Sequence, residues 1–471
     1  MERIALVEKF LESNAVLDRV AKELFERLPL TLRYRIYYGK NFLYWLAFLK
    51  ESEYWDKERL ESFQFEQLKA LLKHASQNVP YYKKQFSDYG ITPDTLQCID
   101  DIKKLPYLTK ETVRDNANDF IANNIPKSTL IKTTTSGSTG IPLVIYKTKK
   151  SIEQEHASLF NLLSRVGYNP KKKIVSFQWG DITRGKKEGN FLRYGNKLVL
   201  SVISTASTQT MYNYYKMITT FRPEFISGFK TVLLSFASFI KEQGLLSFTD
   251  LKAALAYAEL IHPWQRELIE ASFGARVFST FGMDENVIFG GECEYSYATH
   301  LYPQTGTTEL VDLGDTYSEM IGTGFSNYAM PFIRYKTMDF CTKGGCCCKR
   351  CGRNFLLLEE IHGRVNEFLV DKNGRIVYPV MDEFNPDIFK NVKEFQFFQD
   401  EPGIVYMRIV RRDTYSDSDT LAIKIEISKR LNVPSSGIEI QIAFVEHIER
   451  TSSCKSLRTD QRLDIKNFIK T

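Results

Sequence analysis

Between residues 144 and 243 the chain alternates short apolar runs with segments of helical periodicity. The apolar runs are typical of strands, and the segments between them carry apolar residues at three- and four-residue spacing. The strand candidates are Val144–Tyr146, Ile174–Phe177, Lys197–Ile203 and Phe225–Ser227, and the helix candidates are Glu153–Arg165, Met211–Phe221 and Thr231–Gln243. This alternation predicts an α/β domain in which helices cover a largely parallel sheet.

The segments on either side of this core differ in pattern. The first hundred residues have helical periodicity, with Pro29 ending the first helical pattern. After residue 364 two strand patterns flank Asn373-Gly374, a strong hairpin signal, and further strands and one helix follow. A chain of 471 residues is too long for one hydrophobic core. We predict a helical N-terminal part of the large domain at 1–110, an α/β core at 111–363 and a small α+β C-terminal domain at 364–471.

Aromatic and basic residues are interspersed in the segment 32–49. A basic, aromatic helix can lie in a membrane interface, but aromatic residues at helical spacing more commonly pack into a core. We therefore predict a helix packed against the main domain, with peripheral membrane contact as the alternative.

Composition excludes several classes of protein. Hydrophobic residues make up 43% and charged residues 25%, which is the balance of an ordinary globular protein. The net charge of +6 is mild and forms no long block, so no nucleic-acid partner is implied. No secretion signal is evident, the apolar runs are too short to span a bilayer, and five of the eight cysteines lie between Cys341 and Cys351. These features predict a cytoplasmic protein with a metal site, and they leave the oligomeric state open, a dimer included.

The stretch Thr134–Pro142 is rich in small hydroxyl residues and glycine. It lacks the Gly-Lys-Ser/Thr ending of a nucleotide-kinase phosphate loop, so composition alone supports a structural turn and a phosphate cradle equally. Hydroxyl groups and exposed backbone amides can bind an anion even without a cation.

The motifs after this loop follow the order found in the adenylate-forming superfamily, which includes acyl-CoA synthetases, luciferase and peptide-synthetase adenylation domains. The matching segments are Tyr257-Ala258-Glu259, Phe281-Gly282-Met283-Asp284-Glu285, Tyr335–Asp339, Gly363–Asn366 and the late Lys455. The chain resembles this superfamily over these motifs. The resemblance implies that ATP activates a carboxylic acid as an acyl-adenylate with release of pyrophosphate, and that the small C-terminal domain is mobile.

The resemblance also assigns roles to residues. In the loop, the phosphates of ATP would be held by Thr135, Ser136, Gly137, Ser138, Thr139 and Gly140. Other nucleotide contacts would come from Ala258, Glu259, Phe281, Gly282, Asp284, Asp339 and Arg364, with Asp339 accepting both ribose hydroxyls. Glu285 would hold Mg²⁺, Asn366 stands at the hinge, and Lys455 would neutralise charge at the α-phosphate. The pocket for the acid is predicted around Trp179, Gly228, Phe229 and Thr280.

A narrower resemblance, to phenylacetate–CoA ligases and their CapK-like relatives of capsule synthesis, covers almost the whole chain. It is carried by Asn78–Tyr82, Leu105–Lys110, His262–Arg266 and Pro331–Tyr335, with the CapK-like branch as the closest match. It implies acyl transfer to a thiol such as CoA, or to an amine in polysaccharide biosynthesis. Because Asp284 replaces the usual Thr near the α-phosphate, the alternative is a catalytically impaired nucleotide-binding scaffold of a membrane-associated polysaccharide assembly.

The cysteine spacing predicts a zinc site. Cys348 and Cys351 form a C-x-x-C-G knuckle, whose turn directs two thiolates at one metal ion. Cys293 and His300 supply a second pair, as in the zinc-bearing relatives, with Cys346 as the first substitute ligand and Cys341 and Cys347 as others. Four protein ligands leave no open position, so the predicted role is structural.

Overall fold

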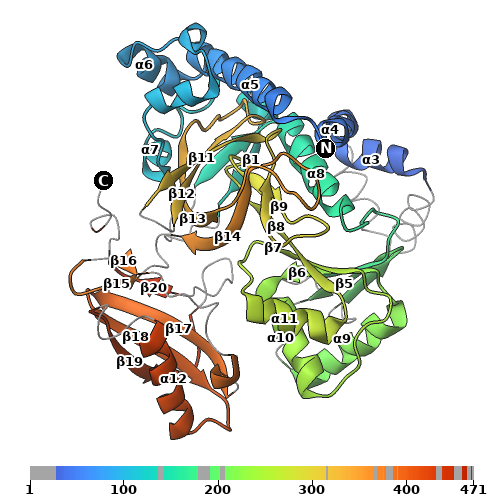
Figure 1. The fold of residues 1–471 in the computed structure, drawn as a ribbon. Helices are drawn as coiled ribbons and strands as arrows, with labels where there is room; N and C mark the ends of the chain where they lie inside the picture. Colours follow the sequence, from blue (N-terminus) through green and yellow to red (C-terminus); the bar gives the residue numbers. More distant parts are fainter. Residues whose placement is uncertain are drawn as a thin grey trace.

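The computed structural model describes residues 28–135, 143–178, 191–201, 207–313, 317–364, 369–374, 376–377, 386–389, 391–430, 437–449, 459–463 and 468. A large α/β unit runs to residue 364 and a small α+β unit follows it, so the predicted fold class is confirmed (Figure 1). No helix in these ranges has both the length and the apolar character needed to cross a membrane.

Five parallel strands form the centre of the large unit, in the order β5-β3-β6-β7-β8, and β4 pairs antiparallel with β5 at the edge. Their bounds are β3 (Ile174–Gln178), β4 (Phe191–Tyr194), β5 (Lys197–Ser201), β6 (Phe225–Phe229), β7 (Ala253–Tyr257) and β8 (Arg276–Gly282). The helices between them are α9 (Thr208–Phe221), α10 (Lys230–Glu242) and α11 (Pro263–Phe273). The predicted strands at β3, β5 and β6 and the predicted helices at α9 and α10 are therefore confirmed, whereas β4, β7, β8 and α11 were not predicted.

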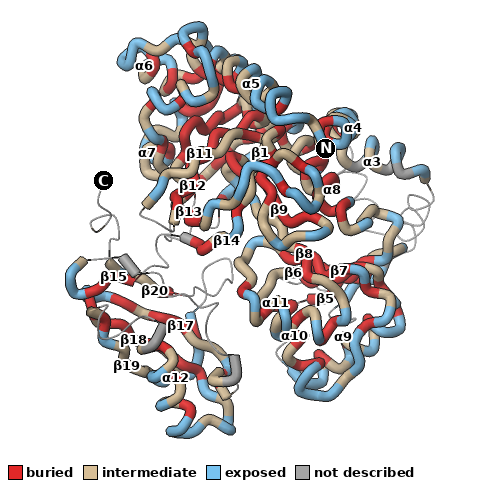
Figure 2. Tube along the Cα trace, in the orientation of Figure 1, coloured by how far each residue is buried: buried red, intermediate tan, exposed pale blue. Residues whose placement is uncertain are grey.

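Both faces of this parallel sheet are buried, as strand β7 illustrates (Figure 2). Ala254 and Ala256 point into the core shared with α9, α10 and α11, whereas Ala253 and Leu255 point into a second core formed with α4 and α8. Successive residues of a strand face opposite sides, so an unbroken apolar run is what a doubly covered strand requires.

The sheet continues beyond β8 as an antiparallel half. The first part of β8 pairs with β7 in parallel, and Thr280–Gly282 pairs antiparallel with β9. The strands follow in the order β9-β10-β14-β13-β12-β11, with bounds β9 (Phe289–Gly291), β10 (Thr299–Leu301), β11 (Gly306–Asp312), β12 (Ser318–Gly324), β13 (Tyr335–Lys343) and β14 (Leu357–Arg364). The sequence pattern did not predict this half.

The N-terminal segments cover the large unit from outside (Figure 1). They comprise α3 (Leu30–Tyr38), α4 (Lys40–Ser52), α5 (Lys57–Asn78), α6 (Pro80–Asp88), α7 (Lys110–Asp115), a hairpin of β1 (Ile131–Thr134) and β2 (Val144–Lys147), and α8 (Lys149–Ser164). Helices α5 and α6 pack over the antiparallel half, where the Tyr82 hydroxyl donates to the carbonyl of Pro331 (3.1 Å).

The aromatic N-terminal segment packs against α8, as the favoured interpretation predicted. Phe42 of α4 is fully buried, and its ring and that of Tyr38 contact Phe160 of α8, with ring centroids 5.5 and 5.1 Å apart. Membrane contact stays a prediction; Leu32, Ile36 and Tyr44 are exposed.

The small unit is a four-stranded sheet in the order β19-β18-β17-β20 with helix α12 against it. Its elements are β17 (Val392–Glu401), β18 (Ile404–Arg411), α12 (Asp417–Arg430), β19 (Glu439–Phe444) and β20 (Thr459–Gln461). Before it, β15 (Leu369–Val370) and β16 (Ile376–Val377) form the predicted hairpin, in which Gly374 has a φ of +76°. A residue without a Cβ suits that turn.

Candidate functional site

The carboxyl ends of the parallel strands meet at one edge of the sheet, where ligands of α/β proteins usually bind. Phe229 ends β6 and Tyr257 ends β7, and their ring centroids are 5.1 Å apart. Ala258, directly after β7, has a φ of +64°, a strained conformation for a residue with a Cβ. The order of the chain thus brings the predicted adenine segment to this edge.

Glu259 fixes the same edge through its carboxylate. One oxygen accepts from the backbone N–H of Thr231 (2.7 Å), and the carboxylate also accepts from the Thr231 hydroxyl (2.8 Å). Thr231 lies in the first turn of α10, where a carboxylate is stabilised by the positive end of the helix dipole. Glu259 therefore ties the end of β7 to the start of α10.

Glu285 lies in the turn between β8 and β9. Its Oε1 accepts a hydrogen bond from the Tyr335 hydroxyl of β13 (3.1 Å), and no hydrogen bond reaches Oε2 within the described part of the chain. A carboxylate oxygen left available in this way is a suitable Mg²⁺ ligand.

Asp339 and Arg364, two predicted nucleotide contacts, are direct cross-strand partners on β13 and β14. The Asp339 side chain is buried, and its backbone N–H donates to the hydroxyl of Thr337 (3.1 Å). Of Arg364 only the backbone is described. Sheet register therefore brings together two residues that lie far apart in the sequence.

Thr135 closes the base of the predicted phosphate loop. Its N–H donates to the carbonyl of Leu143 (2.9 Å), and the N–H of Leu143 donates to its hydroxyl (3.0 Å). Some of the other predicted site residues lie outside the part of the chain that the structure describes. They are Ser136, Gly137, Ser138, Thr139, Gly140, Trp179, Asn366 and Lys455.

A buried ion pair at the end of the β1–β2 hairpin opposite to this loop was missed by the sequence analysis. Lys147 at the end of β2 has a side chain only 4% exposed, and its Nζ lies 2.9 Å from the carboxylate of Glu155 on α8. Burial raises the pKa of Glu155, and the nearby Asp284 carboxylate raises it further, while Lys147 opposes the rise. A cation is therefore buried at the end of β2, although the loop itself has none.

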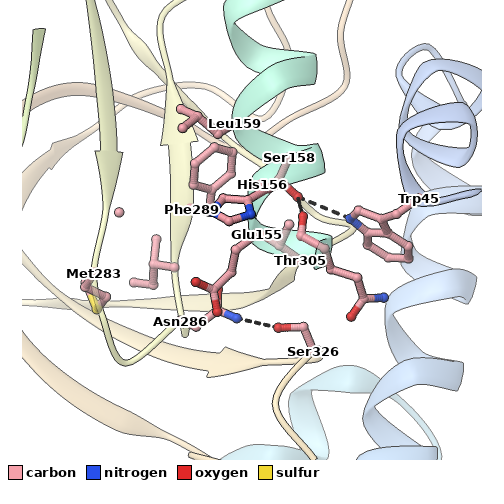
Figure 3. A pocket seen from close by; sticks show the side chains of 13 residues that line it. Trp45, Glu155, His156, Ser158, Leu159, Met283, Asn286, Phe289, Thr305 and Ser326 are labelled. Atoms are coloured by element: carbon pink, nitrogen blue, oxygen red, sulfur yellow. Dashed lines mark hydrogen bonds between the residues drawn. The ribbon is translucent and has the colours of Figure 1, made fainter. Parts of the chain in front are cut away.

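A cavity of about 210 Å³ opens between α4, α8 and the β8–β9 turn (Figure 3). It adjoins Gly282 and Met283, so it borders the predicted nucleotide segment. Its remaining lining residues are Trp45, Gln154, Glu155, His156, Ser158, Leu159, Asn286, Ile288, Phe289, Thr305 and Ser326. The predicted pocket residues Gly228, Phe229 and Thr280 do not line it.

The four predicted zinc ligands lie together in the antiparallel half. His300 lies on β10, Cys293 lies between β9 and β10, and Cys348 and Cys351 lie between β13 and β14. The ligand atoms of Cys293, His300, Cys348 and Cys351 all lie within 4.8 Å of one another. A zinc ion with bonds of 2.3 Å to sulfur needs tetrahedral edges of about 3.8 Å, so the cluster fits with little adjustment. The substitute candidates Cys346 and Cys347 are exposed and are not part of this group.

Hydrogen bonding orients the histidine of this cluster. His300 Nδ1 lies 2.9 Å from the carbonyl of Ala298, which fixes Nδ1 as the protonated nitrogen and leaves Nε2 toward Cys351 (3.4 Å). Burial lowers the pKa of His300 to about 4, so the imidazole is neutral at pH 7, the form that binds a metal.

Comparison with known proteins identifies the class. The solved structure of 2-hydroxyisobutyryl-CoA ligase in a postadenylation state, bound to R3-HIB-AMP, superposes with a TM-score of 0.67 at 16% identity, over 89% of this chain and 92% of that one. The chain therefore has the fold of the adenylate-forming CoA ligases, as its motifs predicted.

Sequence relatives narrow this class. Phenylacetate–coenzyme A ligase of Escherichia coli strain K12 is 27% identical over 79% of this chain and 83% of its own, and Protein CapK of Staphylococcus aureus is 26% identical over 92% and 96%. The family model of the CapK C-terminal domain matches residues 369–458. The chain therefore resembles phenylacetate–CoA ligases and CapK in sequence and the adenylate-forming CoA ligases in fold, which confirms the predicted resemblance.

Proposed function

We propose that the chain activates a small carboxylic acid with ATP, releases pyrophosphate, and passes the acyl group to a thiol or an amine. The observation that carries the proposal is the hydrogen bond from Tyr335 to Glu285. Phe281, Glu285 and Asp339 come from separate strands and turns, yet Tyr335 links Glu285 to the strand that carries Asp339. The relatives named as CoA ligases support the same reaction.

Each candidate has a distinct role in this reaction. The buried Asp339 carboxylate accepts the ribose hydroxyls, and the aromatic face of Phe281 packs on the adenine. Glu285 holds Mg²⁺, which neutralises phosphate charge when it is bound. Lys455, brought in by the small C-terminal domain at 364–471, stabilises the charge that develops at the α-phosphate as the acid attacks.

Lys147 supplements this set. It is a buried cation at the end of β2, in a chain whose hydroxyl-rich loop has no lysine. Its partner Glu155 keeps the pair neutral while no anion is bound.

Zinc in the Cys293, His300, Cys348 and Cys351 cluster has a structural role in this proposal. A closed set of three thiolates and one imidazole would tie the segment after β9 to the segment before β14. The use of ATP and CoA, together with thiols kept reduced for metal binding, supports a cytoplasmic location. CoA is the proposed thiol acceptor, and the amine acceptor applies if the chain acts in polysaccharide assembly as the name CapK suggests.

Exchange of labelled pyrophosphate into ATP, measured across a panel of carboxylic acids, tests the proposal. At least one acid should support exchange, and both Glu285→Gln and Lys455→Ala should lower its rate by about 100-fold or more. ATP binding with no exchange for any acid would instead identify the catalytically impaired scaffold.

A further inference from the structure

The cavity between α4 and α8 contains polar groups that the nucleotide chemistry does not use. Several of its polar side chains bond to one another or to backbone. The indole N–H of Trp45 donates to the Ser158 hydroxyl (3.2 Å), and Asn286 donates to Ser326 (Figure 3). The Thr305 hydroxyl donates to the carbonyl of Tyr302 (3.0 Å). These bonds fix the walls of the cavity before any ligand binds.

Two polar side chains on α8 remain available. Within the described part of the chain no hydrogen bond engages the carboxamide of Gln154 or the imidazole of His156, although both line the cavity. The His156 ring contacts that of Tyr38 edge-on, with centroids 5.2 Å apart, and stays accessible through the cavity. Burial by surrounding groups, and then the Lys147 charge, lower the pKa of His156, so the ring is neutral at pH 7. A neutral imidazole and a carboxamide each offer both a donor and an acceptor.

The carboxylate in the cavity wall is already paired. Glu155 is the acid in the cavity wall, and its carboxylate is bound by Lys147. A second charged group on a ligand would therefore lack a free partner there. Uncharged hydroxyl groups match Gln154 and His156 better, because each hydroxyl both donates and accepts.

The remaining wall is apolar and the space is small. Leu159, Ile288 and Phe289 form the apolar part, and the volume of about 210 Å³ is below the range of about 300–1,000 Å³ usual for drug-sized ligands. A compact carbon skeleton with hydroxyl substituents on one side fits this arrangement.

We propose that this cavity receives the acyl part of the substrate and selects a small hydroxylated carboxylic acid over its unsubstituted counterpart. The inference rests on the proposed adenylating function. It follows from the position of the cavity beside Gly282 and Met283, which places a bound acid next to the predicted nucleotide segment. An acid without hydroxyl groups would leave Gln154 and His156 without partners in a partly desolvated site, which weakens its binding.

Pyrophosphate exchange with matched pairs of acids tests this selection. The pairs are 3-hydroxybutanoate with butanoate and mandelate with phenylacetate, and kcat/KM is compared within each pair. We expect at least one hydroxylated acid to be preferred by about tenfold or more. Gln154→Leu and His156→Phe should each reduce that preference by roughly three- to tenfold, the value of one neutral hydrogen bond. Lys150→Gln, an exposed change on α8 outside the cavity, should leave the ratio unchanged.

The outcomes separate the two proposals. If exchange occurs but neither hydroxylated acid is preferred over its unsubstituted counterpart, the selection is refuted and the adenylating function stands. If the preference exists but survives both cavity variants, the cavity is not its source. If no acid supports exchange while ATP still binds, the proposed function fails and the selection fails with it.

Discussion

Asp339 on β13 and Arg364 on β14 are direct cross-strand partners. Asp339 is the predicted ribose contact, and Arg364 lies in the segment predicted to form the hinge. A strand pair holds its cross-strand partners about 4.5–5.5 Å apart at Cα or Cβ, so this register fixes the backbone positions of both residues. The proposed ribose contact therefore lies directly next to the point where the chain leaves the large unit. A change in the hinge can act on the nucleotide without a long path through the protein.

Asp339→Asn should weaken ATP binding about 10- to 100-fold. The change removes a charged acceptor, and hydrogen bonds to charged groups contribute about 1.5–3 kcal/mol. Isothermal titration with ATP measures the effect, and thermal unfolding checks that the buried position tolerates the amide. Unchanged ATP affinity in a folded variant would remove Asp339 from the nucleotide site.

Tyr335→Phe should raise the Mg²⁺ concentration needed for half-maximal exchange about tenfold or more. The hydroxyl of Tyr335 donates to Glu285, and partners that orient a metal ligand typically contribute 10- to 100-fold in metal affinity. A magnesium titration of exchange at saturating ATP measures the shift. Tyr89→Phe, at an exposed tyrosine, is the control, and an equal response of the two variants would contradict the role.

How far the sequence could predict the fold depends on strand length and setting. Parallel strands such as β5 were predictable because burial on both faces requires an unbroken apolar run, here Leu198-Val199-Leu200. Strands β9 and β10 have three residues each, too few to show a period. Gly291 in β9 is needed because a Cβ there would lie 2.5 Å from a methyl group of Leu162, a packing requirement that only the folded chain reveals.

The candidate site likewise contains residues that the sequence could predict and residues that it could not. Glu285 and Asp339 were predictable because they stand in ordered motifs that resemble those of a known superfamily. Lys147 and His156 were not, since a lysine that ends a strand is ordinarily solvated and a single histidine has no pattern. The burial of Lys147 depends on Glu155, eight residues later on another element. The two side chains meet only because α8 packs against the β1–β2 hairpin.

Cys348→Ser should release a stoichiometric zinc ion and lower the melting temperature. Replacement of one thiolate by a poorer ligand should weaken zinc binding more than 100-fold, since even partners outside the ligand shell contribute 10- to 100-fold. Elemental analysis of the purified protein and a thermal scan measure the two effects. Cys346→Ser is the matched control, because Cys346 is exposed and lies outside the cluster. Equal zinc loss in both variants would place Cys346 among the ligands.

Lys147→Met should destabilise the protein by about 3 kcal/mol. Removal of one partner leaves the Glu155 carboxylate largely buried without its cation, and breaking a buried pair usually costs 3–5 kcal/mol. Urea unfolding measures the change in free energy. The double variant Lys147→Met with Glu155→Leu should recover most of the loss; if it is as unstable as the single variant, the unpaired charge is not the cause.

The raised pKa of Glu155 predicts a pH dependence of stability. Burial raises this pKa above its value in the unfolded chain, so the native state binds the proton more tightly. The associated stabilisation is complete below the unfolded pKa of about 4.3 and is lost as the pH rises through the native pKa. The difference in unfolding free energy between Glu155→Gln and the unmodified protein should therefore shift in favour of the variant as the pH rises. Urea unfolding at pH 4.5 and pH 7.5 measures that shift. A difference that stays constant over this range would show that Glu155 titrates at the same pH in both states, and that Lys147 fully offsets its burial.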